Sequence, residues 1–168
     1  MQNNQIKCPI FNDDYMNEYD QMTEDERKKY GAIWTPPKII SEMMCCGYKT
    51  QKDFDDFWSD PNKTVLDPTA GAGNIIVCMI LNKLYHGVSP TMAIKNSYAI
   101  ELQQKNVDIC RKRILKIVGD TPEHRKIVNH NIVCCDFFLW DIENWRKKTD
   151  AEIRELAKTD KMYRKYVK

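Results

Sequence analysis

The sequence lacks the long apolar stretches that membrane proteins and secreted precursors carry. It contains no run of about 18 apolar residues, the length that marks a membrane-spanning helix. Residues 1–5 are polar and carry none of the apolar core of a signal peptide. We therefore expect an intracellular, cytoplasmic protein. With 168 residues, 42% of them hydrophobic, the chain is long enough to bury the core of one domain.

The chain also lacks the paired cysteine motifs of structural zinc sites. Its seven cysteines include no Cys-x-x-Cys, and two pairs are adjacent, Cys45-Cys46 and Cys134-Cys135. Adjacent cysteines seldom bond to each other, and their apolar neighbours favour buried free thiols in a reducing compartment. A zinc site built on His130 and Cys134 lacks a second ligand pair at usable spacing, so we predict no metal site.

Charge is distributed unevenly, although the net charge of +2 is too small to indicate a nucleic-acid partner by itself. Residues 1–30 hold four basic and seven acidic side chains, whereas residues 146–168 hold nine basic and four acidic ones. The basic segment can face phosphate, but a solvated helix face is the simpler interpretation, which we favour. We expect residues 1–30 to form an arm and a short helix with a capping box at residues 23–26, and residues 146–168 to form a basic helix capped at Thr149.

The most informative stretch combines a strand, a small-residue loop and a helix. Residues 63–67 are an apolar run that ends in Asp67, a loop with Gly71 and Gly73 follows, and residues 74–86 are predicted to be helical. The two glycines allow the backbone to bend sharply and to approach a ligand closely. The loop is neither a GxGxxG fingerprint nor a Walker loop, so a glycine-bearing surface turn is the alternative for this loop taken alone.

Two further strands follow in the same pattern. We predict a strand at residues 98–101 that ends in Glu101, an amphipathic helix with an apolar stripe from Val107 to Val118, and a strand at residues 131–136 that ends in Asp136. Right-handed crossovers turn this β–α–β–α–β order into a parallel sheet. The carboxyl ends of the strands then meet at one edge, where open α/β sheets bind ligands. The sequence therefore predicts an α/β fold with three acids at one site.

The residues around this unit carry weaker expectations. Thr35 is predicted to cap a helix that begins at Pro36, and residues 37–46 repeat apolar side chains at helical spacing. Residues 47–63 are expected to be a polar linker with an aromatic cluster. Most of the cationic side chains at positions 111–113 and 116 should be solvated.

Three carboxylates at one edge suit a ligand that has a ribose, an adenine and a cationic amino group. Glu101 can accept hydrogen bonds from both ribose hydroxyls, and Asp136 can accept one from an exocyclic amine. Phe137 offers a ring for stacking, and Asp67 can face a cationic group near the glycine loop. Three carboxylates would repel a phosphate-rich cofactor. For each acid alone, a solvated strand end is the alternative.

These residues resemble the successive cofactor motifs of S-adenosylmethionine-dependent DNA adenine-N6 methyltransferases. The resemblance runs from about residue 31 to residue 140. It implies a Rossmann-like methyltransferase fold with a partial parallel sheet, in which residues 31–145 bind S-adenosyl-L-methionine and DNA supplies a flipped-out adenine. Thr35 and Pro36 would lie by the methionine carboxylate, and Glu101, Asp136 and Phe137 would bind the adenosine. The methionine part would be held by Asp67, Pro68, Thr69, Ala70, Gly71 and Gly73.

The chain departs from that family at the catalytic loop. The sequence has one Pro-Pro, Pro36-Pro37, and no Asn-Pro-Pro-Tyr-type loop follows a fourth strand. The strand at residues 63–67 would then have an open apolar edge. Three explanations remain open: the tail covers this edge, a second polypeptide completes the sheet, or the chain is the front part of a longer enzyme. We predict a split or truncated adenine-N6 methyltransferase of bacterial or phage restriction–modification type. The alternative is a non-catalytic cofactor-binding regulatory or partner subunit.

Overall fold

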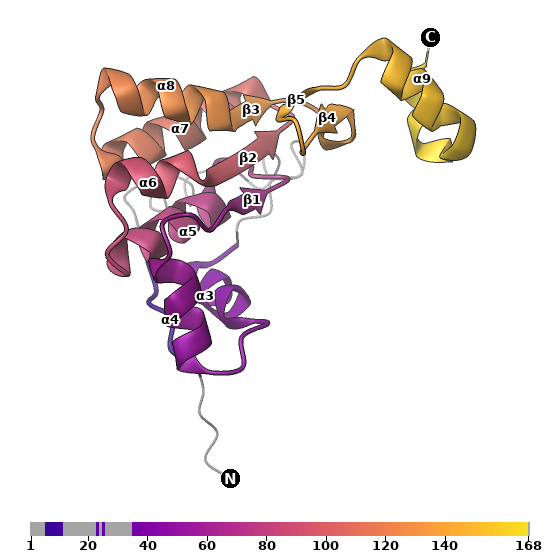
Figure 1. Ribbon diagram of the computed structural model, residues 1–168. Helices are drawn as coiled ribbons and strands as arrows, with labels where there is room; N and C mark the ends of the chain where they lie inside the picture. The colour runs from indigo at the N-terminus through magenta and orange to yellow at the C-terminus, as the bar shows by residue number, and fades with distance from the viewer. Residues whose placement is uncertain (1–5, 12–22, 24, 26–34, 168) are drawn as a thin grey trace.

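The computed structural model describes residues 6–11, 23, 25 and 35–167. Within them, a parallel sheet of three strands is flanked by helices in a mixed α/β arrangement (Figure 1). The predicted β–α–β–α–β order is confirmed, because each strand pairs in parallel with the next one along the chain. In sheet order, the strands are β1 (Val65–Asp67), β2 (Ser97–Glu101) and β3 (Ile132–Cys134).

The helices between the strands supply most of the core. Their apolar faces bury Ile76, Ile80, Val107 and Ile114, each at most 1% exposed, and burial of such side chains stabilises the fold by about 1.5–3 kcal/mol apiece. The expected helix at residues 74–86 and the amphipathic helix that Gly119 ends are both present. The helices are α5 (Asn74–Tyr85) and α6 (Pro90–Lys95) between β1 and β2, and α7 (Gln104–Val118) and α8 (Pro122–Asn131) between β2 and β3.

Helix α3 (Pro37–Cys45) matches the expected helix but not the expected cap. Pro36 occupies the N-cap position and Pro37 the first turn, so Thr35 lies one residue outside the cap. The predicted capping role of Thr35 is therefore wrong. The helix packs against α5 with Ile40 and Met44 buried, while the neighbouring apolar residues of the stripe, Ile39 and Met43, are 42% and 49% exposed.

Residues 47–63 are not a linker, because they contain helix α4 (Gln51–Ser59). Thr50 accepts a hydrogen bond from the Asp53 N–H, and the Asp53 side chain accepts one from the Thr50 N–H, which makes a complete capping box. The two rings four residues apart, Phe54 and Trp58, are both buried. The aromatic cluster expected from the sequence is thus the inner face of a helix.

The C-terminal part places a hairpin beside the sheet, and its last helix extends away from the sheet (Figure 1). A two-stranded antiparallel hairpin is followed by a helix that Thr149 and Glu152 cap, as the sequence predicted. A one-turn 3-10 helix precedes the hairpin and a longer one ends the described chain. The elements are η1 (Phe137–Leu139), β4 (Trp140–Asp141), β5 (Arg146–Lys147), α9 (Asp150–Thr159) and η2 (Lys161–Tyr166).

Several remaining expectations can be compared with the structure. None of the seven cysteines is in a disulfide, but Cys46 and Cys134 are exposed rather than buried. None of the described helices has the length and apolar character that crossing a bilayer requires. Apart from Thr23 and Asp25, the capping box expected at residues 23–26 lies outside the described residues.

Candidate functional site

The glycine loop between β1 and α5 has one face packed against the protein and one face open. Gly71 and Gly73 have φ values of +54° and +94°, in the left-handed region that favours glycine. A Cβ on Gly73 would lie 2.6 Å from the Sγ atom of Cys110, whereas a Cβ on Gly71 would meet no atom of the described residues within 4 Å. Gly73 therefore permits close packing of the loop on α7, and Gly71 leaves the opposite side open to a ligand.

Asp67 ends β1 with an unpaired carboxylate oxygen. The residue is 4% exposed, and its Oδ1 atom accepts a hydrogen bond of 3.2 Å from the Thr69 N–H. The Oδ2 atom is buried and, among the described residues, has no hydrogen-bond partner. Burial, and to a smaller extent the nearby charge of Glu101, raise the pKa of Asp67 to about 6, although the backbone N–H groups of Thr69 and Ile76 oppose the rise. A buried polar atom without a partner is unfavourable, so this oxygen is suited to a donor or cation that enters the loop.

Glu101 ends β2 and joins it to the glycine loop. Its Oε2 atom accepts a hydrogen bond of 2.9 Å from the Gly71 N–H. Its Oε1 atom accepts bonds of 2.9 Å from the Gln103 N–H and 3.4 Å from the Asn106 side-chain amide. The structure thus brings Asp67 and Glu101 to one loop, as the strand pattern predicted. A carboxylate offers about four acceptor positions, so one stays free for a ligand hydroxyl.

Asp136 lies beyond the end of β3 rather than within it. The strand stops at Cys134, so the prediction that it runs to Asp136 is wrong by two residues. Asp136 instead caps η1, where its Oδ1 atom accepts a hydrogen bond of 3.0 Å from the Phe138 N–H. The N–H of Cys135 donates to the carbonyl oxygen of Glu101 at 2.9 Å. Asp136 therefore still follows the carboxyl end of the sheet, next to Glu101.

Two other predicted residues have simpler surroundings. The half-buried ring of Phe137 lies edge-on to Phe138 with centroids 5.6 Å apart. Thr35 is half-buried at the start of α3, and among the described residues no hydrogen bond joins it to the glycine loop. The structure therefore groups Asp67, Glu101 and the glycines directly, with Asp136 and Phe137 next along the edge.

Arg113 supports the loop from behind and was missed by the sequence analysis. It was placed among mainly solvated cations, yet it is 6% exposed. Its Nη1 atom donates to the carbonyl oxygen of Ala72 at 2.6 Å and to Oδ1 of Asn74 at 2.8 Å. The sequence did hold a signal, because Arg113 stands three residues after Cys110 and thus on the buried stripe of its helix.

The carboxylates at this edge can accept hydrogen bonds from a cationic group and from a hydroxyl. No three His, Cys, Asp or Glu side chains of the described residues are grouped so that they could hold a metal ion. Comparisons of the chain with family models, with curated proteins and with solved structures find no match.

Proposed function

We propose that this chain binds S-adenosyl-L-methionine on a Rossmann-like domain and serves as the cofactor-binding part of a split or truncated DNA adenine-N6 methyltransferase. The observation that carries the proposal is the buried Oδ2 atom of Asp67, which has no partner within the described part of the chain, beside a glycine loop where no described atom lies within 4 Å of a Cβ placed on Gly71. A carboxylate held at low exposure without a partner favours a cationic ligand, since a cation would relieve its desolvation.

The residues present fit the groups of S-adenosylmethionine. Asp67 would accept hydrogen bonds from the cationic amino group, and Glu101 would accept one from a ribose hydroxyl at its remaining acceptor position. Asp136 would accept a bond from the adenine amine while Phe137 contacts the ring. When bound, the cofactor supplies an electrophilic methyl group on its sulfonium, and this chain's residues fix where that methyl group lies. Thr35 and Pro36 stay part of the proposed site on the strength of the sequence resemblance alone.

The arrangement of the sheet supports a partner chain. Within the described residues, β1 is an edge strand whose one sheet neighbour is β2. The tail does not reach this edge with its last helix, because Tyr166 contacts Asp136 beyond β3, the opposite edge strand. The C-terminal hairpin lies over one face of β1 and β2, where a hollow of about 220 Å³ is lined in part by Leu66, Tyr98 and Trp145, so the edge of β1 is a separate surface. We propose that a second cytoplasmic polypeptide completes the sheet here and brings the catalytic loop.

Calorimetric titration of the full chain with S-adenosylmethionine tests the cofactor site. We expect saturable binding that weakens at least about tenfold in Glu101→Ala and in Asp136→Ala, because each variant removes a charge-assisted acceptor. Asp108→Ala, an exposed acid on α7, is the control and should bind like the wild type. Unchanged affinity in both site variants would show that the pocket lies elsewhere.

The second candidate function is a non-catalytic cofactor-binding subunit, which the absence of an Asn-Pro-Pro-Tyr-type loop from the sequence favours. A methyl-transfer assay distinguishes the two functions. The chain is incubated with labelled S-adenosylmethionine, adenine-containing duplex DNA and a candidate partner that carries the loop. Methyl transfer to adenine N6 in the mixture supports the split enzyme. Cofactor binding without transfer supports the regulatory subunit, and absence of both rejects the proposed function.

A further inference from the structure

The hydroxyl group of Tyr166, near the end of the described chain, contacts one of the proposed ligand-binding acids. It donates a hydrogen bond of 2.6 Å to the Oδ2 atom of Asp136, thirty residues earlier in the chain. The other carboxylate oxygen already accepts from the Phe138 N–H. Both oxygens of Asp136 therefore accept hydrogen bonds from within the chain, Oδ1 from a backbone N–H and Oδ2 from the Tyr166 hydroxyl.

The segment that carries Tyr166 is also held by ring and charge contacts. The Nζ atom of Lys165 lies 4.6 Å from the centroid of the Tyr166 ring and 5.9 Å from that of Phe138. These distances fall within the range of cation–π attraction. Partial burial and the hydrogen bond with Asp136 raise the pKa of Tyr166 above its ordinary value. The residue therefore stays a neutral hydrogen-bond donor at physiological pH.

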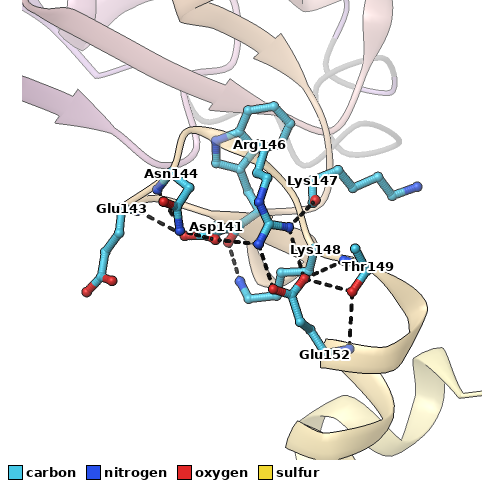
Figure 2. Close-up of polar contacts among 9 residues, drawn as sticks. Asp141, Glu143, Asn144, Arg146, Lys147, Lys148, Thr149 and Glu152 are labelled. Carbon is cyan, nitrogen blue, oxygen red and sulfur yellow. Dashed lines mark hydrogen bonds and ion pairs between the residues drawn. The ribbon is translucent and has the colours of Figure 1, made fainter.

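A polar network fixes the helix from which this segment extends (Figure 2). Arg146 of the hairpin lies between Asp141 and Glu152, with nitrogen–oxygen distances of 3.3 Å and 2.6 Å. Glu152 also accepts from the N–H of Thr149 at 2.7 Å, so it holds the start of α9. Helix α9 in turn packs closely on η2. The hairpin thus presents η2, and with it Tyr166, to Asp136 in a defined position.

We infer that Tyr166 is an autoinhibitory latch on the proposed cofactor site, an inference that rests on the proposed function. The Tyr166 phenol stands beside the carboxylate oxygen to which the adenine amine would donate, so it hinders the approach of the ligand to Asp136 although the carboxylate keeps free acceptor positions. Short, charge-assisted bonds of this kind are stronger than neutral ones, and the ligand must displace the phenol. If the latch is closed in about nine molecules of ten, the apparent affinity falls about tenfold.

The test compares three forms of the full chain by calorimetric titration with S-adenosylmethionine. Tyr166→Phe keeps the ring but removes the hydroxyl, so it should bind the cofactor about tenfold more tightly than the wild type. Tyr163→Phe is the matched control, because Tyr163 belongs to the same 3-10 helix and its ring lies 6.4 Å from that of Tyr166. It should bind like the wild type.

Each outcome of this comparison decides one question. Tighter binding in Tyr166→Phe alone supports the latch, as does binding by Tyr166→Phe when the wild type shows none. Equal binding by the wild type and Tyr166→Phe overturns the latch and leaves the proposed function standing. Weaker binding in Tyr166→Phe also overturns it, since the phenol would then belong to the binding site. Absence of binding in all three forms overturns the proposed function and the latch with it.

Discussion

The backbone of Gly73 lies so close to Cys110 that an added Cβ would come within 2.6 Å of the Sγ atom. The contact joins the glycine loop to the helix that follows β2, and Arg113, one turn later on that helix, donates to the carbonyl oxygen of Ala72. The loop is therefore shaped from behind by α7 as well as by its own glycines.

We expect Gly73→Ala to destabilise the protein by about 2–4 kcal/mol, because it combines left-handed strain with overpacking against a buried thiol. Gly71→Ala is the matched control, with a positive φ of +54° but no atom within 4 Å of the new Cβ, and should lose about 1 kcal/mol. Urea denaturation measures both. Equal losses of unfolding free energy in the two variants would mean that the structure around Cys110 accommodates the added methyl group without a loss of stability.

Asp67 should make stability depend on pH in the acid range. Its pKa is about 6 in the folded protein against an ordinary 3.8, so between these values only the folded state holds the proton. Stability therefore rises as pH falls from 7 to 4, and the ionised carboxylate costs up to roughly 3 kcal/mol at neutral pH.

Asp67→Asn should remove the destabilisation caused by the ionised carboxylate and so raise the melting temperature at pH 7. It should also flatten the dependence of stability on pH between pH 4 and pH 6. Asp108→Asn, an exposed acid, makes the same change of charge and should leave the profile unaltered. Thermal unfolding across this range measures the effect. A wild-type stability that falls steadily from pH 7 to pH 4 would contradict the assigned burial of Asp67. The stabilised variant should also lose affinity for S-adenosylmethionine under the proposed function.

Asn82 is a second buried polar group without partners. It lies in α5 with 0% exposure, and in the part of the chain that the structure describes neither its amide nitrogen nor its amide oxygen has a hydrogen-bond partner. Asn82→Leu conserves much of the shape and removes both unpaired groups, so we expect stabilisation by about 1–3 kcal/mol. Calorimetric melting checks it, with Asn82→Asp as the contrasting variant that should destabilise. A lower melting temperature for Asn82→Leu would show that the amide has a partner in solution.

The capping box of α4 should contribute measurably to stability. Thr50→Ala removes the oxygen that accepts from the Asp53 N–H, and we expect a loss of about 1 kcal/mol. Thr50→Ser keeps the hydroxyl and should recover most of that loss. Chemical denaturation distinguishes the two. Equal stability of the alanine and serine variants would mean that the cap contributes nothing.

The sequence predicted the sheet well because strand, loop and helix follow one another with clear apolar periodicity. It missed α4 because the box there has Asp53, rather than glutamate or glutamine, at the third helical position. The burial of Arg113 was not predicted, because its hydrogen-bond acceptor lies far away in the sequence. The carbonyl oxygen of Ala72, to which Arg113 donates, is 41 residues earlier in the chain.

The candidate site was predictable only in part, for a related reason. Parallel pairing places Asp67 and Glu101 together by topology alone. The engagement of Asp136 by Tyr166 depends on where the C-terminal unit packs, and local sequence patterns carry no information about it. Thr35 shows the same limit, since the choice between Thr35 and Pro36 as N-cap is made by the packing of α3 on α5.

The neighbour order of the sheet has a consequence for biosynthesis. Each strand pairs with the one that the ribosome makes next, so β2 can dock on β1 before β3 has been synthesised. The sheet grows in one direction during translation, and the outer edge of β1 is synthesised before the other two strands. A partner that adds a strand there can begin assembly on the nascent chain, while the residues that carry Tyr166 are still inside the ribosome.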